Sequence, residues 1–274
     1  MGWTIAFVAL AVVVIGMVLV ASASTSGSGS GITTPTVLTP TNIQWTGRTL
    51  GKPNAPVTVD LYGDFRCSAC AAFTIEGSEG ALVSEYVATG RAKLVWHDRL
   101  VIDEMRKDGT ASRDAANAAM CAADQNKFWL MHDWLYANQS PTEDSSAFTT
   151  AKLSSIAKAA GLDMTRLQPC LDAGTHDAEI TAANASIAKT ITGTPTIYVN
   201  HQMVGDPGTG NAASYQEIKA AIDAAPAAAP TASPAPATPT PTPTPATTVA
   251  PSDAPSVSPS VSPSASTSPS VKPS

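Results

Sequence analysis

Two cysteines spaced three residues apart, Cys67 and Cys70, follow an apolar run in the stretch DFRCSACAAF at residues 64–73. A C-x-x-C pair of this kind can be an inert disulfide, one half of a zinc site, or a thiol couple that exchanges disulfides with other proteins. A zinc site needs two further ligands at a comparable spacing. Cys121 and Cys170 each stand alone and the four histidines are scattered, so the sequence favours a disulfide or redox role over zinc.

A redox role requires the first cysteine to be reactive as a thiolate, because the thiolate is the nucleophile in disulfide exchange. At the N-terminus of a helix, unpaired backbone N–H groups and the helix dipole stabilise a thiolate. We therefore expect Cys67 to be exposed at a helix start, where it attacks or is attacked. Cys70, one turn further along, would then resolve the mixed disulfide. Arg66 would make the surroundings of the pair slightly positive.

The elements around the pair predict this placement. The segment VTVDLY at 57–62 alternates apolar and polar residues, which indicates a strand. After the cysteines, apolar residues support a helix to about Thr89, with glycines at 77 and 80 weakening its middle. The segment AKLVW at 92–96 indicates a second strand. Residues 57–96 thus read as a strand–helix–strand unit with the cysteines at its first turn.

From Ser112 to about Lys189 the pattern becomes helical, with an Ala-rich stretch at 111–137 that contains neither Gly nor Pro and predicts one long helix. We interpret the charged residues at 103–107 as a solvated loop. Strand chemistry returns near the end of the domain, so the predicted architecture is α/β. The remaining elements are expected as helices at 147–160, from Asp163 through Cys170, at 177–190 and at about 213–224, and as strands in TIYV and QMV around a tight turn near Asn200 and His201.

Composition divides the chain of 274 residues into a domain and its flanks. Residues 225–274 consist mainly of Pro, Ser, Thr and Ala, so we expect a disordered tail that cannot bury enough apolar surface to fold. Residues 24–42 are rich in Ser, Gly, Thr and Pro and predict a flexible linker. This leaves residues 43–224 as one domain. The net charge of −6 and the absence of a Lys/Arg cluster in the sequence exclude nucleic acid as an expected partner.

The N-terminus predicts export. Residues 5–21 form an uncharged apolar run, close to the ~20 residues that cross a bilayer as a helix. ASA at 21–23 is also a site that a signal peptidase could cut. Residues 1–23 are therefore either a signal-anchor that tethers the domain to the cell membrane or a cleaved signal peptide. Outside the cytoplasm an even number of cysteines favours disulfides, and four cysteines allow three connectivities.

These residues resemble those of the DsbA-type thiol–disulfide oxidoreductases in the thioredoxin-like superfamily, exported bacterial proteins. The matching stretches are GKPNAPVTVDLYGDFRCSAC, NAAMCAADQNKFWLMHDWLYANQ and TGTPTIYVNHQMVG. The resemblance implies a thioredoxin-like fold with an inserted all-helical subdomain at about residues 100–190. It implies that Cys67 and Cys70 are catalytic, and that Thr194 and Pro195 form a cis-proline loop that binds substrate. It also implies a structural disulfide between Cys121 and Cys170.

The chain departs from the family pattern in two respects. Family members usually carry an acidic residue six positions before the first cysteine, where this sequence has Leu61. Asp60 precedes it on the opposite strand face, and Asp60 or Asp64 would replace the missing acid only through a change of register. The dipeptide between the cysteines is Ser-Ala and lacks a histidine, so strong thiolate stabilisation is not expected. We interpret His97, at the end of the second strand, as structural.

We therefore predict an extracytoplasmic oxidase that exchanges disulfides with extended, cysteine-containing secreted polypeptides. Neither a cofactor nor a metal is expected, because the cysteines themselves carry the electrons. The resemblance further implies a membrane quinone-linked partner that reoxidises the pair. Two alternatives stay open: a disulfide reductase or isomerase of the same fold, and a non-catalytic exported module whose disulfides are purely structural.

Overall fold

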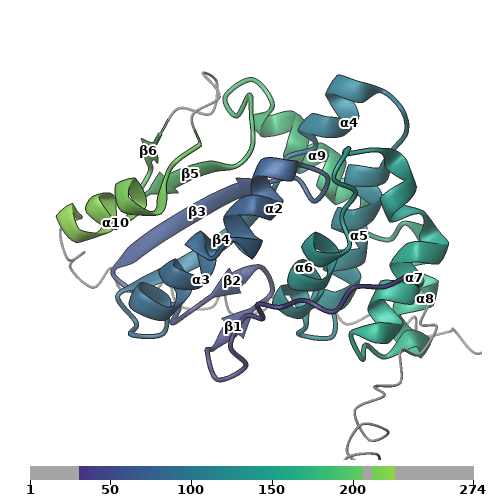
Figure 1. The fold of residues 1–274 in the computed structure, drawn as a ribbon, viewed down its shortest axis with the longest axis horizontal. Coiled ribbons are helices and arrows are strands. Elements are labelled where there is room, and N and C mark those ends of the chain that lie inside the picture. The colour runs from purple at the N-terminus through teal and green to yellow at the C-terminus, as the bar shows by residue number, and fades with distance from the viewer. Residues whose placement is uncertain (1–30, 206–211, 226–274) are drawn as a thin grey trace, which may run out of the picture. The chain divides into compact units, whose positions relative to one another are not determined.

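The structure, a computed structural model, describes residues 31–205 and 212–225. The predicted membrane segment at 5–21 and all but the first residue of the predicted tail lie outside these ranges. Among the helices that are described, none is long and apolar enough to cross a membrane. The described residues combine a β-sheet with a group of helices gathered at one end of it (Figure 1).

The sheet is built around two parallel strands, β3 (Val57–Gly63) and β4 (Ala92–Asp98), which pair Leu61 with Trp96. Along both strands buried and half-buried residues alternate, so the predicted period of two is confirmed. Within the described residues the sheet has six strands in the order β1-β2-β4-β3-β5-β6. The outer strands are β1 (Trp45–Thr46), β2 (Thr49–Leu50), β5 (Thr196–Val199) and β6 (Gln202–Val204), and β5 runs antiparallel to β3.

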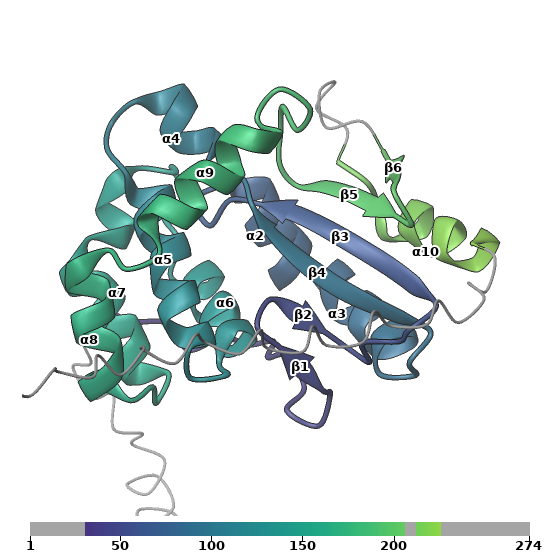
Figure 2. The same ribbon diagram turned by 180° about the vertical axis from the view of Figure 1, so that it is seen from behind.

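One face of the sheet is covered by α2 (Ser68–Ile75), α3 (Ser78–Leu82) and α10 (Tyr215–Ala224), as Figures 1 and 2 show from opposite sides. The helical insertion follows β4 and returns to β5, in agreement with the α/β fold and inserted all-helical subdomain that the resemblance implied. Its helices are α4 (Val101–Arg106), α5 (Ala111–Ala123), α6 (Phe128–Ala137), the 3-10 turn Ser145–Phe148, α7 (Thr150–Ala159), α8 (Met164–Ala173) and α9 (Asp177–Ile187).

Two predicted helices are interrupted. The helix after the cysteines breaks at Gly77, whose φ of 98° is left-handed, and continues as α3 and a π-helical turn at Val83–Val87. The stretch 111–137 is not one helix, because Asn126 adopts a φ of 55° and the chain turns between α5 and α6. The Lys127 N–H then donates to the Ala122 carbonyl and closes the end of α5. Asn tolerates the left-handed region better than most residues, so a helix can end without Gly or Pro.

The segment predicted as a flexible linker is attached to α6 over its described part. The Thr33 N–H donates to Asn138 Oδ1 at 2.7 Å, and the Thr39 N–H donates to Asp133 Oδ2 at 2.6 Å. Polar side chains on α6 thus satisfy backbone groups of a segment that composition alone assigns to a linker. Residues 31–42 are therefore held against the helical insertion, although most of them are exposed.

The contact between Gly63 and Trp96 fixes the end of β3. A Cβ atom added to Gly63 would lie 2.2 Å from Trp96 Cη2, and Trp96 is buried with its ring 4.9 Å from that of Phe65. We expect Gly63→Ala to lower the free energy of unfolding by about 1–3 kcal/mol, because the indole has no room to move. Urea denaturation followed by far-UV circular dichroism measures this.

The matched control is Gly80→Ala, where the nearest atom to the new Cβ is 3.7 Å away. Because Gly80 lies in α3, the added methyl group should keep or raise stability by about 0.5–1 kcal/mol. Equal effects of the two substitutions would contradict the proposed clash.

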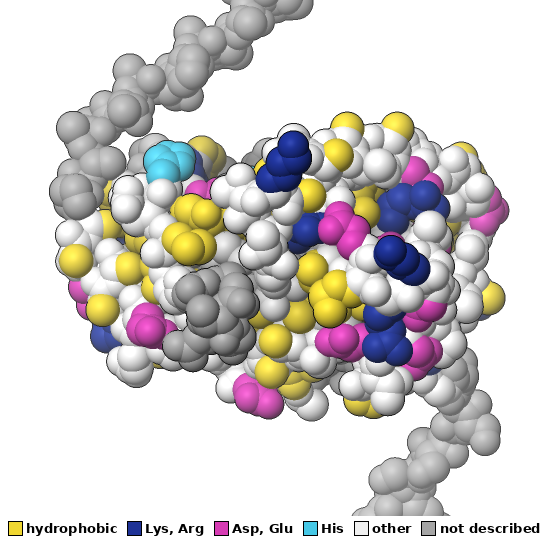
Figure 3. Space-filling model, turned by 90° about the horizontal axis from the view of Figure 1, so that it is seen from above, with side chains coloured by type: hydrophobic (Ala, Val, Ile, Leu, Met, Phe, Trp, Pro, Cys, Tyr) yellow, Lys and Arg dark blue, Asp and Glu magenta, His cyan; other side chains and the backbone are white. Residues whose placement is uncertain are grey.

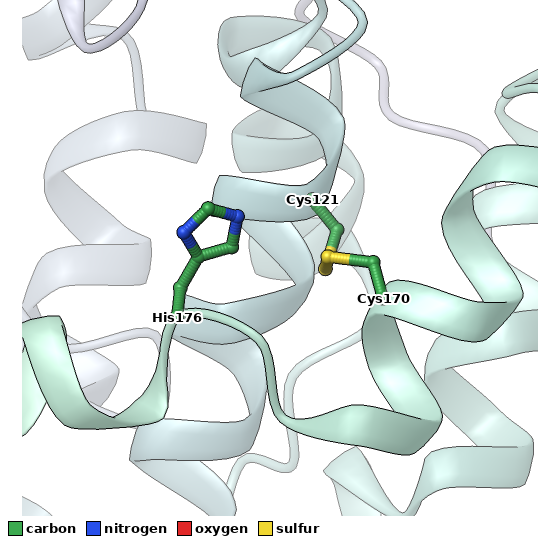
Figure 4. Close-up of side chains that lie close together, drawn as sticks. All are labelled: Cys121, Cys170 and His176. Carbon is green, nitrogen blue, oxygen red and sulfur yellow. A yellow bond between two sulfur atoms is a disulfide. The ribbon is translucent and has the colours of Figure 1, made fainter. Parts of the chain in front are cut away.

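A disulfide joins α5 to α8 through Cys121 and Cys170, with a Cα–Cα distance of 5.9 Å (Figure 4). It closes a sequence separation of 49 residues. Replacing both cysteines by alanine should lower the free energy of unfolding by on the order of 4 kcal/mol in the chain-entropy model. Urea denaturation of the double variant beside Cys67→Ser, which leaves this disulfide intact, tests this. An unchanged midpoint in the double variant would show that the bond adds no stability.

Candidate active site

Cys67 and Cys70 lie where β3 passes into α2. Cys67 occupies the N-cap position of α2 with an extended backbone, and its carbonyl accepts the first helical hydrogen bond, from the Ala71 N–H at 3.1 Å. Cys70 lies in the first turn of the helix. Both are free thiols in the structure. Cys67 thus lies at the start of a helix, as the sequence predicted from the strand–turn–helix pattern, and the N–H groups of Ala69 and Cys70 act on its sulfur atom.

Both thiols are more enclosed than the sequence suggested. Only 6% of Cys67 and 2% of Cys70 is exposed, so the prediction that Cys67 is exposed at the turn is wrong. The cover over Cys67 comes from a distant part of the chain, since its Sγ lies 3.3 Å from the Thr194 carbonyl oxygen. On the other side, Gln139 Nε2 donates to the carbonyls of Phe65 and Cys67 and holds the turn in place.

The two thiols differ in acidity. The pKa of Cys67 is lowered to about 7, first by a hydrogen bond from the Cys70 thiol, then by the Thr194 side chain and backbone N–H groups, while burial opposes the change. The pKa of Cys70 is raised well above its usual value, mainly by burial. Near neutral pH Cys67 is thus the reactive sulfur and Cys70 keeps its proton.

Thr194 and Pro195 form the loop that the resemblance implied, and the peptide bond between them is cis. The loop precedes β5, which pairs with β3 so that Thr196 lies opposite Tyr62. This antiparallel pairing brings residues 194 and 195 to the same end of the sheet as Cys67. The structure therefore brings Cys67, Cys70 and the loop together. Cys121 and Cys170, which are bonded to each other, lie away from this site in the helical subdomain.

Arg66 does not make the entrance positive, because its side chain is fully buried. Its guanidinium donates to Asp103 Oδ1 at 2.7 Å, to Asp108 at 2.9 Å and to the Glu143 carbonyl. Asp103, interpreted from the sequence as part of a solvated loop, lies instead in α4. These contacts tie the active-site turn to the insertion. No local sequence pattern reveals them, since the partners lie 37 to 77 residues away.

Asp64 supplies a buried carboxyl group at the turn that carries the thiols. β3 ends at Gly63, so the chain turns and the strand alternation no longer directs the Asp64 side chain. Its oxygens accept from the N–H groups of Arg66 at 2.8 Å and Ile102 at 2.9 Å. Burial, and to a smaller extent the charge on Cys67, raise the pKa of Asp64 to about 7. Whether Asp64 replaces the missing acid as a proton acceptor for the thiols stays a prediction.

Leu61 and Asp60 have other roles. Leu61 is buried in the core, whereas Asp60 accepts a hydrogen bond from His97 at 2.8 Å on the opposite face of the sheet. His97 also stacks on Tyr62, with ring centroids 4.5 Å apart, which fits its structural interpretation. The described residues bring no third metal-ligating side chain to the Cys67–Cys70 pair.

The surface at this end of the molecule carries charges of both signs. Figure 3 looks onto this end and shows Lys and Arg side chains interspersed with Asp and Glu, most of them on the side of the helical insertion. Apolar and uncharged side chains predominate beside them. The described residues on this face form no broad positive patch.

Comparison with known proteins supports the same chemistry. A family model described as thioredoxin matches residues 44–224. Disulfide bond formation protein D of Bacillus subtilis is 29% identical over 178 residues, which are 64% of this chain and 74% of that protein. The crystal structure of oxidised BdbD from Bacillus subtilis superposes with a TM-score of 0.54 and 26% identity, covering 65% of this chain and 91% of that chain.

A second kind of relative shares only part of its length. The Na(+)/H(+) antiporter NhaA 3 of Salinispora tropica is 32% identical over 154 residues, 55% of this chain but 21% of the antiporter. That match covers about a fifth of the antiporter. Taken with the fold and the paired thiols at the start of α2, the matches to thioredoxin and to the disulfide bond formation proteins show that the chain belongs to the thioredoxin family and is a DsbA-type protein disulfide oxidoreductase.

Proposed function

We propose that the protein is an extracytoplasmic oxidase that introduces disulfides into secreted polypeptides through Cys67 and Cys70. The observation that carries this proposal is the opposite shift of the two thiol pKa values at the N-terminus of α2. A pKa below the ordinary value makes Cys67 a better leaving group than an ordinary thiol and stabilises the reduced enzyme, so both effects act in the direction of substrate oxidation, to an extent that the redox potential of the pair decides. The Bacillus subtilis relative is named a disulfide bond formation protein, which supports oxidation of the substrate as the direction of the reaction.

The reaction begins with the pair as a disulfide. A substrate thiolate attacks Cys67 Sγ, the Cys67–Cys70 bond breaks, and the departing Cys70 sulfur takes up a proton because its pKa is high. A second substrate thiolate then attacks the substrate sulfur of the mixed disulfide and releases Cys67 as a thiolate. The substrate loses two electrons as its disulfide forms, and the enzyme gains them as a dithiol.

The substrate is an extended, cysteine-containing polypeptide. The backbone at Thr194, 3.3 Å from Cys67 Sγ, offers an edge to which such a chain can add by backbone hydrogen bonds. Reoxidation of the pair is assigned to a membrane quinone-linked partner, on the ground of the resemblance. Export is supported by the apolar segment at 5–21, which would either anchor the domain or be cleaved, and by the Cys121–Cys170 disulfide.

A reductase or isomerase is the second candidate, and one observation favours it. A pKa of about 7 for Cys67 is close to that of thioredoxin and far above the ~3.5 of a strongly oxidising DsbA. The sequence also lacks a histidine between the two cysteines, which likewise favours a less strongly oxidising pair. The direction of the reaction therefore depends on the redox potential of the pair.

The acidity of the Cys67 thiol can be measured by alkylation. In the reduced protein the rate of alkylation by iodoacetamide should rise with pH and level off above about pH 7, with one fast thiol that is lost in Cys67→Ser. In Cys70→Ala the midpoint should move upward, because the hydrogen bond that most lowers the pKa of Cys67 is gone. A midpoint unchanged by Cys70→Ala would contradict this assignment of the cause.

The direction of disulfide exchange can be measured from the redox potential and from two activities. The equilibrium between the pair and glutathione gives the redox potential, and refolding of reduced ribonuclease and reduction of insulin give the activities. An oxidase should accelerate refolding more than insulin reduction, and Cys67→Ser should abolish both, whereas the Cys121→Ala/Cys170→Ala variant should keep them at a temperature where it is folded. Faster insulin reduction than refolding would select the reductase.

A further inference from the structure

A second group of ionisable side chains is buried between α3 and α6, separate from the thiols. Glu79 lies in the first turn of α3, and His132 and Asp133 are consecutive residues of α6. Their exposed fractions are 3%, 0% and 5%. One ligand atom from each residue lies within 4.8 Å of those of the other two. A nitrogen and two carboxylate oxygens thus converge inside the domain.

His132 has an unused nitrogen directed into this group. Its Nδ1 lies 3.1 Å from Asp133 Oδ1, but among the described residues the fully buried Nε2 has no hydrogen-bond partner. The nearest carboxylate oxygen to Nε2 is Glu79 Oε2, at 3.8 Å. This separation is too long for a hydrogen bond, and it is of the size that separates two ligands of one metal ion. Buried polar groups are otherwise almost always paired.

The remaining contacts hold the ligands in place. Thr74 Oγ1 donates to Glu79 Oε2 at 2.8 Å, and the Thr39 N–H and hydroxyl donate to Asp133. Aromatic rings hold the imidazole, with centroids 5.0 Å away for Trp96, 5.1 Å for Trp129 and 4.9 Å for Tyr136. Two buried carboxylates and one imidazole leave negative charge in a medium of low dielectric constant, which a cation would neutralise.

A cavity borders one side of this group. A cavity of about 280 Å³ is lined by residues 33–37, Thr74, Ile75, Asp133 and Ala137. Its polar wall therefore includes one member of the group, Asp133, and the hydroxyl residue that binds another, Thr74. The cavity therefore approaches the group at Asp133.

We propose that Glu79, His132 and Asp133 form a binding site for a divalent cation of the zinc class. One imidazole nitrogen and two carboxylate oxygens match the three-ligand sites that zinc occupies with a water molecule in the fourth position. None of the three ligands belongs to the Cys67–Cys70 site. The proposed metal site connects α3, on the sheet, to α6, in the insertion. A bound ion would therefore strengthen the attachment of the insertion to the thioredoxin core.

The test uses the full chain in its oxidised form, so that Cys67 and Cys70 are closed as a disulfide and cannot bind metal. Isothermal titration with Zn²⁺ should give one bound equivalent, and Zn²⁺ should raise the thermal midpoint. Co²⁺, a paramagnetic probe, should quench tryptophan fluorescence, because Trp96 and Trp129 contact His132, and added Zn²⁺ should reverse the quenching. Affinity should fall with decreasing pH as the ligands protonate.

Glu79→Gln, which keeps the shape of the side chain, should weaken Zn²⁺ binding about tenfold or more and abolish the quenching. The matched control is His97→Gln, which disrupts the partly exposed His97–Asp60 pair and should leave both results unchanged. Asp133→Asn serves as a second ligand variant if Glu79→Gln does not fold. Absence of binding to the folded wild type, binding that survives both ligand variants, or binding that His97→Gln abolishes would each overturn the proposal.

Discussion

The guanidinium of Arg66 is buried one residue before the reactive cysteine, and the groups that accept its hydrogen bonds all come from the insertion. A buried cation without partners would cost several kcal/mol, so the turn that carries Cys67 can be stable only when α4 and the loop around Glu143 are in place. Glu143 adds a second connection, because its carboxylate accepts from the Ser68 N–H at the start of α2. The insertion is therefore a structural requirement of the active site.

The enclosure of the thiols has a chemical consequence. Burial alone would raise the pKa of both cysteines, because it disfavours the thiolate. Cys67 escapes this effect because hydrogen bonds from Cys70, Thr194 and the first N–H groups of α2 act on it, whereas Cys70 has no comparable compensation. Two cysteine side chains in one small site thereby have pKa values that are shifted in opposite directions. This difference gives each sulfur a separate part in disulfide exchange.

The buried acidic residues of this chain lie at other positions than the acidic residue that family members usually carry six positions before the first cysteine. With Leu61 in the core, the buried carboxyl group at the active-site turn is that of Asp64, which the N–H groups of Arg66 and Ile102 hold in position. Since Ile102 belongs to α4, this residue too depends on the insertion. Glu79 and Asp133 form a second buried acidic pair around His132, at the junction of α3 and α6. Polar groups thus lie along the contact between the sheet and the helices, where apolar packing alone would leave the two parts less specifically oriented.

The sequence by itself determined the strands β3 to β6, the position of the thiol pair at a strand–helix turn and the α/β class, but it did not reveal the two-residue strands β1 and β2. These follow from local patterns: the alternation in 57–62, the apolar run before Cys67 and the Ala-rich insertion. It did not reveal the break at Asn126, because a left-handed Asn has no signal as clear as Gly or Pro. Only the tertiary structure decided how deeply Cys67 is buried, where Arg66 and Asp103 meet, and that the Asp64 carboxyl is buried against α4. Those features arise from side chains far apart in the chain, and their contacts depend on packing that no local pattern encodes.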